Sequence, residues 1–302
     1  MKARIPSMHK SCLVINAKSL RHSEETMKRT WDELREALKN DVFIYSDTVT
    51  ALNVTFLKQF DQWFHGIGKS EMTVTLSSVF EKNIVGRGTK LDVDEKIEKD
   101  SYNRFMPVSE YIKDDNRFSP AGVEWLYLAI GDSEIIVKEC AEKECRAKSG
   151  ERFGFCKFDV NDNYKDLKLI DLTIANKMSY ERINNILLEI EEKEYKRSLK
   201  YAQKHGFIAY KLNYSDNSVK DEIAKWLLYM YAKMLSENIF VPIKTENKKL
   251  EYAPFQTLAM YFIKEHFDGI IYSSTVCPTA KNIVLFNKHY AVPYGSVQDY
   301  II

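Results

Sequence analysis

The chain has 302 residues, of which 45% are hydrophobic and 29% charged, and its formal net charge is +1. A chain of this size can bury a sizeable core, as one large globular domain or two small ones. The near-zero charge gives no electrostatic reason to expect nucleic acid or an anionic membrane as a partner. Apolar runs such as 226–231 are too short to span a bilayer, and the N-terminus lacks the apolar core of a secretory signal, so we expect a cytoplasmic protein.

The five cysteines and six histidines are scattered along the chain. Cys140 and Cys145 are the nearest pair of cysteines, no Cys-x-x-Cys motif occurs, and no His-x-x-x-His pair lies on a predicted helix. Zinc sites need ligands at closer and more regular spacing than this. The sequence therefore predicts that the protein has no metal site and that its thiols are reduced.

Two amphipathic helices are expected before residue 84. Apolar side chains recur at helical spacing over residues 27–38, after Ser23 as a candidate N-cap, and Asn40 is the expected end. A second apolar stripe runs over residues 52–64 and stops at the glycines of 66–68. We expect the two helices to pack their apolar faces on each other, with a partner-binding groove as the alternative.

From residue 84 onward, short apolar runs alternate with long helical patterns. The charged stretch 92–100 suits a solvated loop or a short helix. No Gly-x-Gly-x-x-Gly motif follows a strand, which argues against a Rossmann dehydrogenase. This mixture of elements predicts an α/β or α+β domain. The expected strands are 83–88, 125–129, 153–158, 167–172, 269–273 and 282–286, and the expected helices are 179–205, 219–235 and 254–266.

Two arginines occupy positions that suit an anion. Arg117 lies in the turn 116–122, directly before a predicted strand. Arg87 lies between Gly86 and Gly88, which would let a ligand approach the backbone closely. A guanidinium offers a planar fork of donors to a phosphate or a carboxylate. Surface arginines without a ligand are the structural alternative.

Three further residues have both a structural and a chemical interpretation. Tyr127, in the middle of a predicted strand, suits a core position with a satisfied hydroxyl. Glu139 flanks a predicted buried helical face at 135–140, where a glutamate is usually solvated. Ser274 follows a predicted strand and suits a turn. Because no Gly-x-Ser-x-Gly motif surrounds it and no histidine pairs with it, a hydrolase triad is rejected.

Five ordered blocks of sequence resemble the RES domain family, which is named after an arginine, a glutamate and a serine. The turn with Arg117 resembles the family's Gly-Arg-Phe-Asn-x-x-Gly turn, a Leu-Tyr-Leu-Ala strand follows it, and Glu139 stands at the place of the acidic residue. The resemblance covers about residues 84–290, and its other blocks are 167–172, 252–256, 267–274 and 282–286.

The chain departs from the family in two places. The family's first strand usually reads Tyr-Arg-x-Arg, whereas this chain keeps only Arg87 and has Thr89 at the second position. Arg104 is the reserve candidate for the missing arginine. The second departure is the long helical stretch at about 174–250, which is expected to be structural padding, with a lid or a partner surface as alternatives.

The resemblance implies an α/β (α+β) fold with a mixed sheet, related to ADP-ribosyltransferases. The implied domains are an N-terminal helical region at 1–83 and a RES-like catalytic domain at 84–302. The implied activity is cleavage of the nicotinamide–ribose bond of NAD+, as a phosphorylase or glycohydrolase that acts as a bacterial toxin or defence effector. An ADP-ribosyltransferase and a degenerate RES domain that binds a nucleotide or a partner are the alternatives.

The resemblance also assigns roles to the candidate residues, which are expected to converge on one cleft. NAD+ is expected as the substrate and not as a prosthetic group, and an antitoxin protein and a homo-oligomer are the partners left open. Glu139 would stabilise an oxocarbenium-like transition state, and Arg87 and Arg117 would pair with the phosphates. The other residues that would contact the substrate are Tyr127 at the nicotinamide ribose, Ser274 through its hydroxyl, and Asn282.

Overall fold

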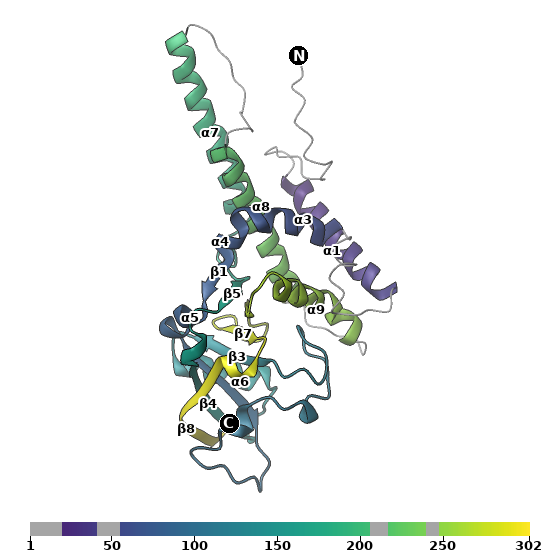
Figure 1. Cartoon of the computed structure of the whole chain (residues 1–302), viewed down its shortest axis with the longest axis vertical. Coiled ribbons are helices and arrows are strands. Elements are labelled where there is room, and N and C mark those ends of the chain that lie inside the picture. Colours follow the sequence, from purple (N-terminus) through teal and green to yellow (C-terminus); the bar gives the residue numbers. More distant parts are fainter. Residues whose placement is uncertain (1–19, 41–54, 206–216, 240–247) are drawn as a thin grey trace. The chain divides into compact units, whose positions relative to one another are not determined.

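The computed structural model describes residues 20–40, 55–205, 217–239 and 248–302 (Figure 1). The chain divides into two compact units. A helical unit takes the described residues of 1–41, 49–71 and 174–235, and a sheet unit takes those of 72–173 and 236–302. None of the described helices is long and apolar enough to cross a membrane.

The helical unit is held together by aromatic side chains. The ring of Trp31 meets that of Phe56 edge-on at 5.0 Å between centroids, and Phe56 meets Tyr231 at 5.5 Å. The buried hydroxyl of Tyr231 donates a hydrogen bond of 3.0 Å to Gln59 Oε1. The helices of this unit are α1 (Leu20–Asn40), α3 (Thr55–Trp63), the π-helical turn η2 (Phe64–Gly68), α7 (Tyr180–His205) and most of α8 (Asn217–Ile239), with α4 (Lys69–Met72) at its boundary.

The predicted packing of the two N-terminal helices on each other is therefore confirmed. The predicted cap is wrong, because α1 already includes Leu20 and Ser23 lies inside its first turn. Leu52, at the start of the second predicted stripe, lies outside the described residues.

The sheet unit contains one mixed sheet of eight strands in the order β1-β5-β6-β7-β3-β2-β4-β8 (Figure 1). All neighbours are antiparallel except β5 and β6, which run parallel. This architecture confirms the predicted mixed α/β fold. The strands are β1 (Thr73–Thr75), β2 (Ile84–Lys90), β3 (Leu126–Gly131), β4 (Arg152–Val160), β5 (Lys168–Asp171), β6 (Gly269–Ser273), β7 (Lys281–Leu285) and β8 (Ala291–Ile301).

All six predicted strands form, but the sequence missed β1 and β8. β8 is the longest strand of the sheet unit, yet it carries Pro293 and Gly295, which sequence patterns associate with turns. Its register on β4 shifts between Phe155 and Lys157, so apolar and polar residues do not alternate regularly along it.

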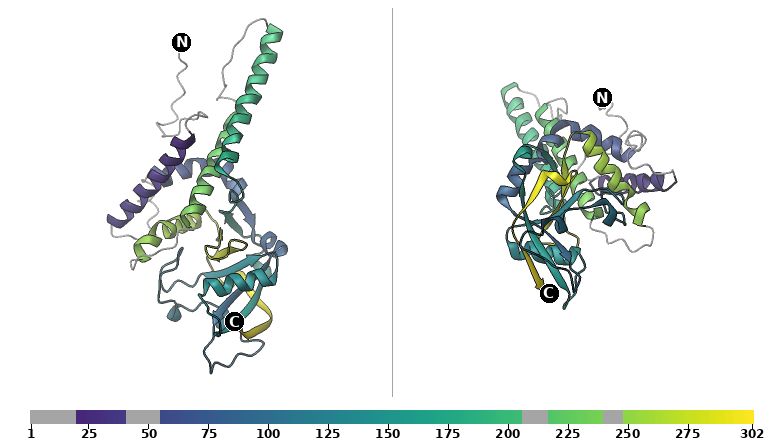
Figure 2. Two further views of the ribbon diagram at one scale, coloured as in Figure 1. Left: turned by 180° about the vertical axis from the view of Figure 1, so that it is seen from behind. Right: turned by 60° about the horizontal axis from the view of Figure 1, so that its bottom comes forward.

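Helices and apolar side chains cover both faces of the sheet. In β3, Leu126, Leu128 and Ile130 point into one core, whereas Ala129 belongs to the opposite core beneath α6. α6 lies against β2 and β3 on that second face (Figure 2). The helices of this unit are α5 (Leu76–Lys82), α6 (Glu134–Glu144) and α9 (Lys248–Lys264), with short 3-10 turns at η3 (Tyr102–Phe105), η4 (Ser109–Tyr111), η5 (Asp162–Tyr164) and η6 (Lys288–Tyr290).

The buried face of α6 differs from the predicted one. Val137, Cys140 and Ala141 are buried, whereas Ile135 is 78% exposed. The helix starts after Ser133, whose hydroxyl accepts from the amide of Ile136 and caps it. α9 also differs, because it begins at Lys248 and contains Pro254 in its interior. The charged stretch 92–100 forms a loop.

Candidate functional site

A cleft of about 480 Å³ opens in the sheet unit where strands β2 and β3 part. The two strands pair over only three residues each, and the last pair joins Gly86 to Ala129. Beyond this point β2 continues along β4, and the preceding residues of β3 pair only with β7. The charged and tyrosine side chains that line the cleft are Arg87, Asp114, Asp115, Arg117, Tyr127, Lys143, Glu144, Arg146, Tyr252 and Tyr272.

Two arginines in this cleft have buried nitrogen atoms without a hydrogen-bond partner. Among the described residues, the only buried side-chain nitrogen or oxygen atoms that lack a hydrogen-bond partner are Arg87 Nη1 and Arg117 Nη1. Burial lowers the pKa of the Arg87 guanidinium below its ordinary value, but arginine stays charged at neutral pH. A buried charge without partners is costly, so an anion bound between these two groups would relieve that cost.

The residue beside Arg87 does not supply the missing negative charge. Cys145 also lines the cleft, and its Sγ lies 3.4 Å from the carbonyl oxygen of Gly88. Burial raises the pKa of the Cys145 thiol to about 11, so this group is neutral at pH 7. Cys145 therefore does not compensate the positive charge of Arg87.

The turn that carries Arg117 is held by hydrogen bonds on both sides. Gln256 of α9 donates to the carbonyl oxygen of Asn116 at 3.2 Å. Asp115 Oδ1 accepts from the amide of Ala121 at 2.8 Å, and the turn closes with a bond of 2.8 Å from the amide of Asn116 to the carbonyl oxygen of Ser119. These bonds hold the Arg117 backbone in one position, which makes the arginine a preorganised donor.

The glycines that flank Arg87 are also required by packing, in addition to the predicted close approach of a ligand to their backbone. A Cβ at Gly86 would lie 2.3 Å from the Phe155 ring, and a Cβ at Gly88 would lie 2.3 Å from the Phe153 ring. Both rings are fully buried in the core beneath α6. The glycines therefore make room for aromatic side chains of β4, although their backbone also lines the cleft.

Glu144 is the carboxylate that meets the serine and the asparagine of the predicted site. Its Oε1 accepts hydrogen bonds from Ser274 Oγ at 2.9 Å and from Asn282 Nδ2 at 2.5 Å. The Ser274 oxygen in turn accepts from the amides of Val276 and Cys277 at 3.3 and 3.0 Å. Ser274 and Asn282 are buried, and Asn282 lines the cleft. Together they hold one oxygen of Glu144 at the cleft wall.

Glu139, which was expected in the cleft, is not among the residues that line it, although its partner Lys143 is. Its side chain is 50% exposed and pairs with Lys143 at 2.5 Å, one helical turn further on. Glu139 lies one turn after the exposed Ile135, on the solvent-facing stripe of α6. Glu144 instead follows the buried Cys140 by one turn, and Cys140 itself contacts Asn282 Oδ1 at 3.6 Å.

Tyrosines form the third part of the cleft wall. The Tyr127 hydroxyl bonds to Ser119 Oγ at 2.9 Å, and burial raises the pKa of Tyr127 above its ordinary value. Burial likewise raises the pKa of Tyr272 well above its ordinary value. Both phenols are therefore neutral at pH 7, and they offer ring surface and a hydroxyl without adding charge. Tyr252, from the third resemblance block, lines the same cleft.

Arg104, the reserve candidate, lies outside the cleft. Its Nε donates to Glu95 at 2.6 Å and its Nη2 to the carbonyl oxygen of Lys90 at 3.0 Å. These contacts tie the loop after β2 to the end of that strand. Of the two arginine candidates for the first family strand, the structure places only Arg87 with Arg117.

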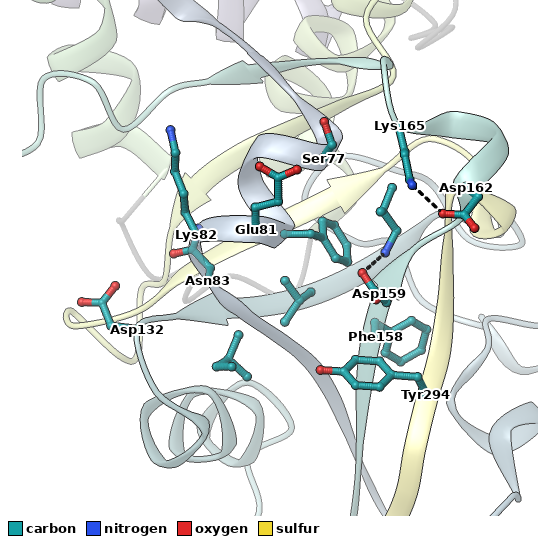
Figure 3. Close-up of a pocket in the computed structure, with 14 residues that line it drawn as sticks. Ser77, Glu81, Lys82, Asn83, Asp132, Phe158, Asp159, Asp162, Lys165 and Tyr294 are labelled. Atoms are coloured by element: carbon teal, nitrogen blue, oxygen red, sulfur yellow. Dashed lines mark hydrogen bonds and ion pairs between the residues drawn. The ribbon is translucent and has the colours of Figure 1, made fainter.

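A second cavity, of about 570 Å³, lies between α5, β2 and β4 (Figure 3). None of the predicted site residues lines it. Four carboxylates face two lysines there, and one of the lysines, Lys165, is paired with Asp162 at 2.8 Å. An anionic substrate would be repelled by this surplus of negative charge. The cleft with the buried, unpartnered Nη1 atoms of Arg87 and Arg117 is therefore the candidate site.

Sequence reasoning missed five charged residues of the cleft: Asp114, Asp115, Lys143, Glu144 and Arg146. Glu144 could have been found from its spacing. It lies four residues, or one helical turn, after Cys140, and the sequence had placed Cys140 on the buried face of this helix. Arg146 and Asp114 lie just outside regular elements, where hydrophobic periodicity carries no information.

The comparison with known proteins places part of this site in a family. Residues 217–300 match the family model described as RES domain. Neither a curated protein nor a solved structure matches the chain. The matched stretch contains α9, β6 and β7, and with them Tyr252, Ser274 and Asn282. The resemblance seen in the sequence is thus confirmed over this stretch, which is similar to a RES domain.

Proposed function

We propose that this protein binds NAD+ in the cleft between β2 and β3 and cleaves its nicotinamide–ribose bond. The observation that carries the proposal is the pair of buried, unpartnered nitrogen atoms of Arg87 and Arg117. The pyrophosphate of NAD+ has two negative charges, which match two guanidinium groups. The volume of about 480 Å³ also lies within the range of about 300 to 1,000 Å³ that small-molecule sites have.

Glu144 is the group that would act on the reacting bond. When the bond between the ribose C1′ and the nicotinamide nitrogen breaks, its electron pair goes to the nicotinamide and positive charge develops on the ribose. A carboxylate at the cleft wall would stabilise that charge electrostatically. Ser274 and Asn282 both donate to Oε1 of Glu144, which leaves Oε2 for the ribose.

The tyrosines and the acceptor complete the proposed reaction. The ring of Tyr127 would lie against the nicotinamide ribose, where a neutral aromatic wall favours a flat, uncharged leaving group. Phosphate, water or a macromolecule would then attack C1′ from the open side of the cleft. Phosphate gives a phosphorylase, water a glycohydrolase, and a macromolecule an ADP-ribosyltransferase.

The direct test is nicotinamide release from NAD+ by the purified full-length chain, with and without phosphate. Arg87→Gln and Arg117→Gln should each raise the NAD+ concentration at half-maximal rate by about tenfold or more, because each removes a charge-assisted contact. Arg104→Gln is the matched control, since that arginine lies outside the cleft and pairs with Glu95. Wild-type activity in both cleft variants would remove the arginines from the site.

The same experiment separates the alternatives. Radiolabelled ADP-ribose on an added protein or nucleic acid would identify a transferase. Saturable NAD+ binding without release of nicotinamide would identify a nucleotide-binding module instead. No NAD+ binding and no turnover would end the proposal.

As a toxin acting on cytoplasmic NAD+, the wild-type protein should lower cellular NAD+ and arrest growth when it is expressed in bacteria. A cleft variant such as Arg117→Gln should be tolerated at the same expression level. An antitoxin protein would then act by covering the cleft or by preventing substrate entry. Growth arrest without loss of NAD+ would point to a different target.

A further inference from the structure

The end of α6 has an unusual residue in a conformation that normally selects glycine. Arg146 has a φ of 52°. The amide of Arg146 donates to Lys143 O, and the amide of Ala147 donates to Glu142 O, both at 3.0 Å. This pair of bonds is the Schellman motif, in which the left-handed position is most often glycine because a side chain there is sterically disfavoured.

The end of α9 has the same arrangement with a different residue. His266 has a φ of 64°, its amide donates to Ile263 O, and the amide of Phe267 donates to Phe262 O, again at 3.0 Å. Arg146 and His266 are the two residues other than glycine with positive φ in the described parts of the chain. The two helix ends therefore form a natural pair for comparison.

The two ends differ in what surrounds them. Arg146 lines the cleft, together with Lys143 and Glu144 of the last helical turn, whereas His266 does not. Lys143 is paired with Glu139, and Glu144 is held by Ser274 and Asn282. Arg146 forms no ion pair or hydrogen bond with its side chain among the described residues. It is therefore a third cation of the cleft without a counter-ion.

We propose that Arg146 is a substrate-binding residue that contacts the pyrophosphate at the mouth of the cleft, and that the left-handed end of α6 places it there. This inference rests on the proposed function, because it names a further residue of the same site. Retention of a strained conformation at a helix end beside a cleft is typical of functional positions. Because Arg146 is exposed, its guanidinium would meet the anion before the anion reaches the buried Nη1 atoms of the half-buried Arg87 and Arg117.

The structural alternative is that Arg146 only stabilises the end of α6. A positive charge near a helix C-terminus interacts favourably with the helix dipole, and Lys143 already lies in the last turn. In that case the loss of the charge would change stability and leave ligand binding unchanged. The two interpretations are separable because binding and stability can be measured on the same variants.

The experiment compares four variants of the full chain: Arg146→Gln, Arg146→Lys, Arg146→Gly and His266→Gly. Each is measured for KM and kcat on NAD+, for the Kd of inorganic pyrophosphate by titration calorimetry, and for Tm. Arg146→Gln should raise both KM for NAD+ and the Kd for pyrophosphate about tenfold and leave kcat unchanged. Arg146→Lys keeps the charge and should stay within about threefold of wild type.

The glycine variants separate backbone strain from charge. Arg146→Gly should show the same loss of binding as Arg146→Gln, together with a Tm about 2 °C above that of wild type, because glycine adopts positive φ without strain. His266→Gly should raise Tm by a similar amount and leave both binding constants unchanged. A gain in stability that coincides with a loss of affinity only at position 146 is the expected signature.

The outcomes distinguish failure of this inference from failure of the proposed function. If wild type turns over NAD+ and the Arg146→Gln and Arg146→Gly variants bind NAD+ and pyrophosphate normally, Arg146 only ends the helix and the inference is wrong. If wild type binds pyrophosphate without turning over NAD+, and Arg146→Gln binds pyrophosphate more weakly than wild type, the anion contact stands and the proposed function fails. If wild type binds neither ligand, both are overturned.

Discussion

Replacement of Glu144 by glutamine tests the proposed chemistry most directly. Glutamine keeps the size of the side chain, and its amide oxygen can accept the bonds from Ser274 and Asn282 that now go to Glu144 Oε1. Glu144→Gln therefore removes the negative charge with little change in packing. A lost electrostatic contact to developing charge typically costs a factor of about 100 or more in turnover, or about 2.7 kcal/mol.

The matched control is Glu139→Gln, five residues earlier on the same helix. Glu139 is half-exposed and pairs with Lys143, and an exposed ion pair contributes little. Its loss should change turnover by less than about threefold. Both variants are measured by nicotinamide release at saturating NAD+, while calorimetric titration checks that NAD+ still binds and circular dichroism checks that each variant is folded.

The reverse result would refute the reasoning. If folded Glu139→Gln loses activity about 100-fold and Glu144→Gln does not, the carboxylate that acts on the ribose would be the one expected from the sequence resemblance. The cleft geometry seen here would then have to change before catalysis. Equal activity in both variants and wild type would remove this helix from the mechanism.

Three further predictions concern the surroundings of the site. Ser274→Ala should lower kcat about tenfold in the wild-type background, because Ser274 acts by positioning Glu144. In the Glu144→Gln background the same substitution should have little further effect, and additive losses in the double variant would contradict this role. Gly88→Ala would place a Cβ 2.3 Å from the Phe153 ring and should lower the free energy of unfolding in urea by about 2 kcal/mol. Gly150→Ala, at a φ of 86° in open space, should lower it by only about 1 kcal/mol, and equal costs would mean that packing on Phe153 is unimportant. Burial raises the pKa of the Cys145 thiol to about 11, and only the thiolate reacts with iodoacetamide. Peptide mass spectrometry should therefore show slow labelling of Cys145 near pH 8 and faster labelling up to pH 11. A labelling rate that levels off below pH 9 would contradict the burial of this thiol.

The sequence by itself determined most of the regular elements of this protein. The six predicted strands and the long helices are all present. Apolar residues at steps of two give a strand one apolar face, and apolar residues at steps of three and four do the same for a helix, so that such a face is buried in almost any compact arrangement. The turn with Arg117 was also predictable, since Pro120 restricts the backbone locally and Gly122 permits the positive φ of 80° that it has there. Elements that follow from local pattern were recognised, apart from the N-cap of α1 and the buried face of α6.

Tertiary structure alone decided which charged residues meet. Glu139 and Glu144 lie on the same helix, and the choice between them depends on which stripe of α6 packs on β2 and β3, not on local pattern. The unpartnered state of Arg87 and Arg117 depends on the parting of two strands whose pairing ends at Gly86 and Ala129. Contacts of this kind join residues that are far apart in the chain, and their energies come from burial and charge that only the folded neighbours create.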